Sequence, residues 1–278
     1  MKTAGLLSIV VAALALDLGA LARGQQPTKI PQIGFLGATS RTAVSDRVQA
    51  FQQGLREFGY IERKTIFVEY RWADGKDERL PELAADLVRL KVDIIVTAGP
   101  KQTPIAQKAT SSIPIVMAFD NDPVGTGVVE SLARPGGNIT GLSTLAPEIS
   151  QKRLEFLKEI VPRLSRVAVL GNSTEPGDTQ MLNEAAKSAL GFNVGLKYFD
   201  IQARGQIKIA FQEASKWRAE ALLALTNPIA TEHRPQIINL AVKYRLPAIY
   251  DRAEFVHDGG LMSYGVSSTD LLLKTISM

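Results

Sequence analysis

Short apolar runs alternate along the chain with longer segments in which apolar residues recur every three or four positions. Continuous apolar runs are typical of strands buried in a parallel sheet, whereas the longer spacing predicts amphipathic helices. The predicted strands are residues 33–36, 66–70, 94–96, 115–119, 167–170, 196–201, 221–225 and 248–250. Helices are predicted between them, for example over residues 48–58, 80–90, 179–190 and 231–244. Strands that alternate with helices favour an α/β fold with right-handed crossovers.

Glycines near residues 136–141 interrupt this alternation, and the pattern restarts after them. The length of the chain allows two modest α/β domains, so we expect the chain to cross from one domain to the other at this interruption. The first domain is predicted to span residues 30–143 and to be completed by about 251–278. The second domain is predicted to span residues 144–250.

The N-terminal residues follow a different pattern, in which Lys2 precedes an apolar run at 4–16 and the small-residue site Ala20-Leu21-Ala22. This order is typical of a secretory signal peptide. The run is shorter than the roughly 20 apolar residues that a membrane-spanning helix needs. We therefore expect residues 1–22 to be removed and the mature chain to work in the periplasm or otherwise outside the cytoplasm. An uncleaved anchor is the alternative.

Composition excludes several kinds of chemistry. The chain has no Cys, which rules out disulfides, thiolate zinc sites and cysteine nucleophiles. The two histidines, His233 and His257, have no second ligand at helical spacing, and no phosphate-binding loop or nucleophile elbow is present. We therefore expect a binding protein with no cofactor and no metal, although Asp120 with Asp122 leaves acid–base chemistry as an alternative. The net charge of +4 is scattered and lacks interleaved aromatics, so no nucleic-acid partner is expected.

Small, hydroxyl or amide residues follow the predicted strands in both halves of the chain. Ligands of open parallel sheets bind beyond the carboxyl ends of strands, where helix N-termini also offer N–H groups to carboxylates. Any one of these residues could instead be a helix cap or a turn former. The predicted ligand contacts are Thr39, Ser40, Ala98, Gly99, Asp120, Asn172, Ser173, Thr226, Asn227 and Tyr250. Asp120 or Asp251 would serve an ammonium group, and Trp72 or Tyr250 could stack on an aromatic ligand.

Several stretches carry a family resemblance, chiefly residues 132–143 (LARPGGNITGLS) and 259–265 (GGLMSYG), with support from 33–36, 51–60 and 122–124. They resemble the substrate-binding proteins of ABC importers, in the family that includes tryptophan/tyrosine-binding proteins. The resemblance implies a type 1 periplasmic-binding-protein fold, with two Rossmann-like, doubly wound parallel-sheet lobes joined by a hinge. It also implies a cleft that closes on a small molecule, with an amino acid or a related organic anion as our best guess, and an ABC permease as partner. Residues 134–141 would lie beside the hinge and outside the ligand site. We expect a monomer.

The resemblance differs at the C-terminal end, where family members continue with a long helix and further sheet elements after the SYG motif. Here only residues 266–278 follow, and they can supply at most one helix. The sequence therefore predicts a C-terminally shortened member with an incompletely covered first lobe. Two alternatives follow: a ligand-sensing subunit that presents a solute to a membrane receptor, or an inactive truncated binding protein.

Overall fold

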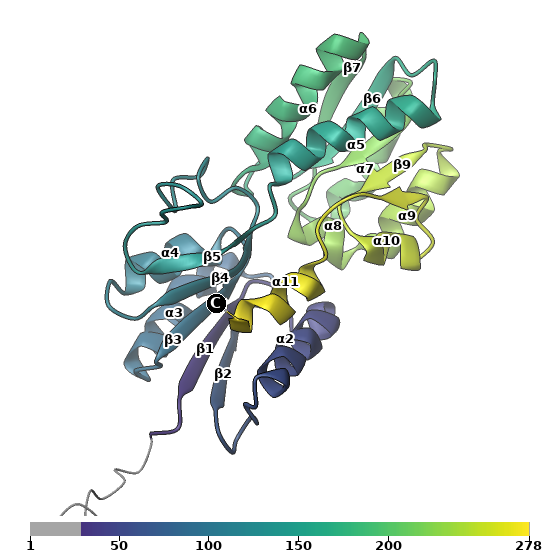
Figure 1. Cartoon of the computed structure of the whole chain (residues 1–278). Helices are drawn as coiled ribbons and strands as arrows, with labels where there is room; N and C mark the ends of the chain where they lie inside the picture. Colours follow the sequence, from purple (N-terminus) through teal and green to yellow (C-terminus); the bar gives the residue numbers. More distant parts are fainter. Residues whose placement is uncertain (1–28, 278) are drawn as a thin grey trace, which may run out of the picture. The chain divides into compact units, whose positions relative to one another are not determined.

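A computed structural model describes residues 29–277, which form two five-stranded sheets with helices on both faces (Figure 1). The first sheet has the order β2-β1-β3-β4-β5 and the second has the order β10-β9-β8-β6-β7. All strand pairs are parallel. The strands are β1 Gln32–Gly37, β2 Phe67–Trp72, β3 Ile94–Ala98, β4 Ile115–Asp120, β5 Ile139–Ser143, β6 Arg166–Gly171, β7 Gly195–Asp200, β8 Ala221–Ala224, β9 Ala248–Tyr250 and β10 Met262–Ser263.

The two sheets share one topology, because in each the first strand along the chain lies between the second and the third. This arrangement is doubly wound, and the strand order reverses beside that first strand. The reversal falls between β1 and β3 in one sheet and between β6 and β8 in the other. Each sheet therefore has one place beyond its strand ends that favours a ligand site. The predicted fold class is confirmed.

Helices cover both faces of each sheet. The helices are α2 Ser45–Glu57, α3 Leu80–Arg89, α4 Gln102–Ala109, α5 Ala146–Ile160, α6 Asp178–Phe192, α7 Arg204–Lys216, α8 Pro228–Glu232, α9 Arg234–Lys243, α10 Ala253–His257 and α11 Ser268–Lys274. Three short 3-10 turns are η1 Thr42–Val44, η2 Asp77–Arg79 and η3 Thr275–Ser277.

The alternation of side chains along β1 illustrates how the cores are built. Phe35 faces α2, where it packs with Phe51 and Leu55, whereas Leu36 faces α3 and packs with Leu87 on the opposite side of the sheet. All five side chains are at most 2% exposed. Burying each one contributes about 1.5–3 kcal/mol, so both faces of this strand hold helices in place.

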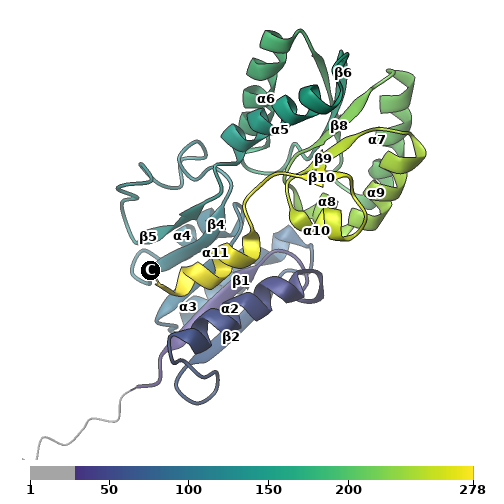
Figure 2. The same cartoon turned by 45° about the vertical axis from the view of Figure 1, so that its right-hand side comes forward.

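The end of the chain returns to the first sheet, where α11 packs against α2 and β4 (Figures 1 and 2). Leu271 and Leu272 are buried in the core beneath α2. Gly54 permits the close approach, because a Cβ atom there would lie 2.7 Å from the carbonyl oxygen of Leu273. The expectation that residues 266–278 supply one helix is confirmed, with η3 as a further turn.

Two strands were not predicted. Residues 139–143, expected to belong to a crossing segment, form edge strand β5 on β4, and residues 262–263 form the short edge strand β10 on β9. The crossing therefore follows β5, between Ser143 and the start of α5 at Ala146. The lobe boundaries themselves stay a prediction.

Candidate functional site

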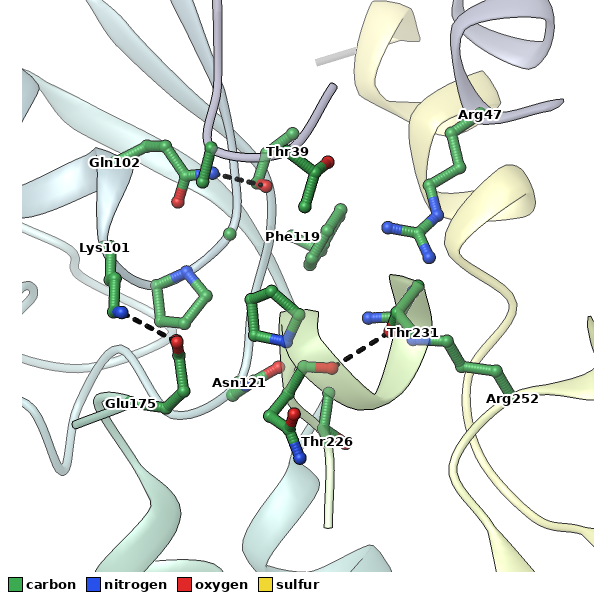
Figure 3. A pocket seen from close by; sticks show the side chains of 16 residues that line it. Thr39, Arg47, Lys101, Gln102, Phe119, Asn121, Glu175, Thr226, Thr231 and Arg252 are labelled. Carbon is green, nitrogen blue, oxygen red and sulfur yellow. Dashed lines mark hydrogen bonds and ion pairs between the residues drawn. The ribbon is translucent and has the colours of Figure 1, made fainter. Parts of the chain in front are cut away.

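A pocket lies beyond the carboxyl ends of strands from both sheets and encloses about 520 Å³ of space, part of it open to solvent (Figure 3). Segments that follow β1, β3, β4, β6, β8 and β9 contribute to its lining, as do α2 and α8. The lining residues are Ala38, Thr39, Arg47, Ala98, Gly99, Pro100, Lys101, Gln102, Phe119, Asn121, Glu175, Thr226, Asn227, Pro228, Thr231 and Arg252. The pocket thus occupies the reversal points of both sheets, where parallel-sheet proteins bind ligands.

Part of the predicted ligand set lines this pocket, namely Thr39, Ala98, Gly99, Thr226 and Asn227. Asn227 also begins α8: its Oδ1 accepts a hydrogen bond from the Ala230 N–H at 2.7 Å, and its Nδ2 donates to the Leu225 carbonyl at 3.2 Å. The capping role considered for such residues therefore applies to Asn227, even though it lies at the pocket. Ligand contact by these residues stays a prediction.

The structure places Ser40, Asn172 and Ser173 outside the pocket lining, in local turns. The Ser173 hydroxyl donates to Asp200 at 2.8 Å, and Asn172 Oδ1 accepts from the N–H and hydroxyl of Thr174. Ser40 accepts from the Ala43 N–H at 3.3 Å. Short polar side chains after strands often stabilise the turn itself, and these three residues do so.

Asp120 and Tyr250 also lie away from the lining, because both are buried in the fold. Asp120 is 0% exposed; one carboxylate oxygen accepts from the Asp122 N–H at 3.1 Å, and the other has no hydrogen-bond partner among the described residues. Burial raises the pKa of Asp120 to about 6. Tyr250 is 1% exposed and stacks on Phe255 with ring centroids 4.4 Å apart. Burial raises the pKa of its hydroxyl. Tyr250 therefore stabilises the core of the second sheet.

Sequence reasoning missed the charged residues of the pocket. Arg47 projects from the first turns of α2 and Arg252 follows β9 (Figure 3). Their guanidinium carbons lie 6.0 and 5.8 Å from the centroid of the Phe119 ring. Arg47 sits among the polar positions of an amphipathic helix, a pattern that predicts only a solvated face. No signal in the sequence connects it to Phe119.

A second charged contact joins the two sheets at the pocket. Lys101 Nζ lies 2.7 Å from the carboxylate of Glu175 and 2.5 Å from that of Asp77. Lys101 follows β3 of the first sheet and Glu175 follows β6 of the second. The Glu175 side chain is only 4% exposed. Burial raises the pKa of Glu175 against the opposing pull of Lys101.

Comparison with known proteins identifies the family. The family model described as "ABC transporter substrate binding protein" matches residues 32–278, which is nearly the whole chain. The chain belongs to this family. The resemblance seen in the sequence is confirmed, and members of the family are binding proteins.

Individual relatives are distant but cover most of the chain. A tyrosine-binding protein of Clostridioides difficile (strain R20291) is 24% identical over 246 residues, 88% of this chain and 70% of that protein. A conserved domain protein of Vibrio cholerae has a TM-score of 0.83 at 24% identity, covering 90% of this chain and 83% of its own. The ABC domain of Streptococcus pneumonia in complex with L-Trp has a TM-score of 0.80 at 22% identity, covering 88% and 83%.

Within residues 29–277, no helix has the length and apolar character needed to cross a bilayer. In the same range, no group of three or more His, Asp or Glu residues gathers as a metal site would require. Residues 134–141, expected to lie outside the ligand site, do not line the pocket. The predicted signal peptide at 1–22 lies outside the described residues.

Proposed function

We propose that this substrate-binding protein is the extracytoplasmic solute-binding subunit of an ABC importer. It captures a small organic acid, an amino acid or a related organic anion, and presents it to a membrane permease. The observation that carries the proposal is the pocket, which draws its lining from the strand ends of both sheets. The family match and the distant relatives named for tyrosine and complexed with L-Trp support a small-molecule ligand.

Binding by hinge closure follows from this lining. A ligand that touches Thr39 on one side and Thr226 on the other gains both contacts only when the two strand ends face each other. Such a ligand stabilises the closed arrangement relative to the open one, because it makes both contacts only in the closed arrangement. The Lys101–Glu175 ion pair adds a protein contact of the same kind. The closed surface then distinguishes the loaded protein from the empty one.

A thermal-shift screen of the mature chain tests the proposal. Amino acids and small organic anions form the panel, and isothermal titration calorimetry follows each compound that raises the melting temperature. A ligand present at about 100 times its Kd adds roughly 2.7 kcal/mol of stability. Thr226→Val keeps the shape of the side chain while removing a pocket hydroxyl. The control, Thr269→Val, removes a hydroxyl that lies outside the pocket lining and bonds to Ser267. If neither Thr226→Val nor any other substitution in the pocket lining changes the affinity, the ligand binds elsewhere.

Transport is tested separately from binding. Radiolabelled uptake is measured in cells that express the partner permease with and without this protein. Uptake that depends on the protein supports the importer. Ligand binding without any effect on uptake would instead favour the sensory role.

A further inference from the structure

The pocket contains two guanidinium groups beside one aromatic ring. Arg47 comes from α2 and Arg252 from the segment after β9, and both lie within 6.0 Å of the Phe119 ring centroid (Figure 3). Phe119 is 4% exposed and is therefore held rigidly by its surroundings. Two residues separated by more than half of the chain thus bring positive charge to the same wall of the pocket.

The two guanidinium groups differ in their partners. Arg252 Nε donates to the Asp251 carboxylate at 2.9 Å, and Arg252 also donates to the hydroxyl of Ser268. The Arg47 side chain makes no hydrogen bond or ion pair with any of the residues that the structure describes. No carboxylate of the described chain therefore forms an ion pair with the Arg47 guanidinium.

The electrostatic surroundings of Arg47 leave this charge poorly stabilised. Burial, followed by the neighbouring charge of Arg252, lowers the pKa of Arg47 to about 9. The carboxylates of Glu254 and Asp251 oppose this effect from beyond ion-pair distance, while Arg234 adds to it. Arg47 is partly exposed at the pocket, and an anion that forms paired hydrogen bonds with its guanidinium would stabilise the charged form.

The pocket has no comparable place for a positive group. Among the described residues, Glu175 is the only acid in the lining, and its carboxylate already binds Lys101. Asp251 is occupied by Arg252, and Asp120 is buried outside the lining. The remaining lining acceptors are neutral; among them, Asn121 Oδ1 is buried with no partner in the described chain and can accept from an O–H or N–H donor of the ligand. A zwitterion would therefore leave its ammonium without a carboxylate.

The walls of the pocket complete the chemistry. Phe119 and the rings of Pro100 and Pro228 provide apolar surface, together with Ala38 and Ala98. Planar apolar groups bury well against such rings, whereas a hydrated aliphatic ligand would leave them in contact with water.

We infer that the ligand is an aromatic carboxylate without an ammonium group, whose carboxylate binds Arg47 and Arg252 while its ring packs against Phe119. The inference rests on the proposed function and narrows its substrate class from organic acids in general to aromatic anions. Arg47 supplies specificity for the carboxylate, and the absence of an unpaired acid in the described lining disfavours the zwitterion.

Matched ligand pairs test the inference by calorimetry on the mature protein. The pairs are phenylpropionate with phenylalanine, hydroxyphenylpropionate with tyrosine, and indolepropionate with tryptophan, which differ within each pair only by the ammonium group. We expect at least one aromatic acid to bind roughly tenfold or more tightly than its amino acid, as a charged hydrogen bond predicts. Phenethylamine, which keeps the ring and the ammonium but lacks the carboxylate, should not bind.

Variants of one helix provide the control. Arg47→Gln should weaken binding of the acid by about tenfold to a hundredfold, whereas Arg56→Gln on the exposed last turn of α2 should leave it unchanged. Arg47→Lys keeps the positive charge but lacks the planar guanidinium, so its affinity for the acid should lie between those of the wild type and Arg47→Gln. Circular dichroism confirms that each variant is folded.

The outcomes separate the two proposals. Tighter binding of an amino acid than of its matched acid, or binding of the acid that Arg47→Gln leaves intact, overturns the aromatic-anion inference while preserving the solute-binding function. Failure of all six compounds to bind overturns the aromatic-anion inference alone, whereas failure of the whole thermal-shift panel contradicts the solute-binding function.

Discussion

The ammonium group of Lys101 lies 2.7 Å from the carboxylate of Glu175, and the two residues follow strands of different sheets. The contact joins β3 of one sheet to β6 of the other directly beside the candidate ligand pocket. An ion pair in this position stabilises only those arrangements in which the two strand ends face each other. If the protein closes on its ligand as proposed, closure and this ion pair would favour the same arrangement.

Glu175→Gln should weaken ligand binding without unfolding either sheet. The substitution removes a charged hydrogen bond that joins the two strand ends, which is worth about 1.5–3 kcal/mol. Lys101 retains Asp77 as a partner, so no cation is left unpaired. Asp77→Asn is the matched control, because it removes the other partner of Lys101 without touching the second sheet. Calorimetry measures both, and equal losses of affinity in the two variants would refute a role for the inter-sheet pair.

Gly54→Ala should destabilise the fold, although alanine is the better helix former. The added Cβ would lie 2.7 Å from the carbonyl oxygen of Leu273 and push α11 away from α2. Overpacking of this kind costs about 1–3 kcal/mol, which exceeds the roughly 1 kcal/mol gained in helix propensity. Gly191→Ala in α6 meets no atom within 4 Å and should instead be stabilising. Urea denaturation compares the two, and stabilisation by both substitutions would show that α11 does not pack closely on α2.

Asp120 should make the protein less stable as the pH rises through the range from about 4 to 6. Burial raises its pKa in the folded state to about 6 from an ordinary value of 3.8, so the folded protein holds the proton more tightly than the unfolded chain. Stability is then highest below about pH 4 for this group, and on the order of 3 kcal/mol is lost by pH 7. Asp120→Asn should remove that loss and raise the melting temperature at pH 7. The difference between wild type and variant, measured from pH 4 to pH 7, isolates Asp120; a difference that does not change with pH would contradict the prediction.

Export should remove the N-terminal residues. Lys2, the apolar run that follows it and the Ala20-Leu21-Ala22 site predict cleavage after Ala22. N-terminal sequencing of protein recovered from the extracytoplasmic fraction should therefore begin at Arg23. Replacing Ala20 and Ala22 with bulky residues should block cleavage, so the uncleaved precursor accumulates. Exported protein that still begins at Met1 would instead favour the uncleaved anchor.

Most strands and helices could be predicted because burial leaves a periodic trace in the sequence. Phe35 and Leu36 belong to a continuous apolar run, and both are buried on opposite faces of β1. β5 and β10 were not predicted, because Gly141 interrupts the apolar pattern of β5 and β10 is only two residues long. Their pairing is decided by backbone hydrogen bonds to neighbouring strands, which side-chain hydropathy does not record.

The candidate site was predictable only in part, for a related reason. Thr39 and Thr226 follow buried strands, and parallel topology brings the carboxyl ends of such strands to one edge. Ser173 occupies an equivalent sequence position, yet its hydroxyl binds Asp200 in a local turn. Residues of the same type at strand ends can thus either line the pocket or stabilise a turn. Contacts that form only in the folded chain decide which of the two occurs.

The sequence by itself determined the α/β class, the family and the strand ends from which the pocket is built, because these depend on local periodicity and short motifs. Tertiary structure alone decided that Arg47 and Arg252 meet beside Phe119, since the three residues lie on separate elements and nothing in their local sequence marks them as neighbours. It also decided that Asp120 is buried away from the pocket and leaves no free acid there. The charge of a binding site is a property of side chains brought together by packing, so it emerges only when the sheets and helices are assembled.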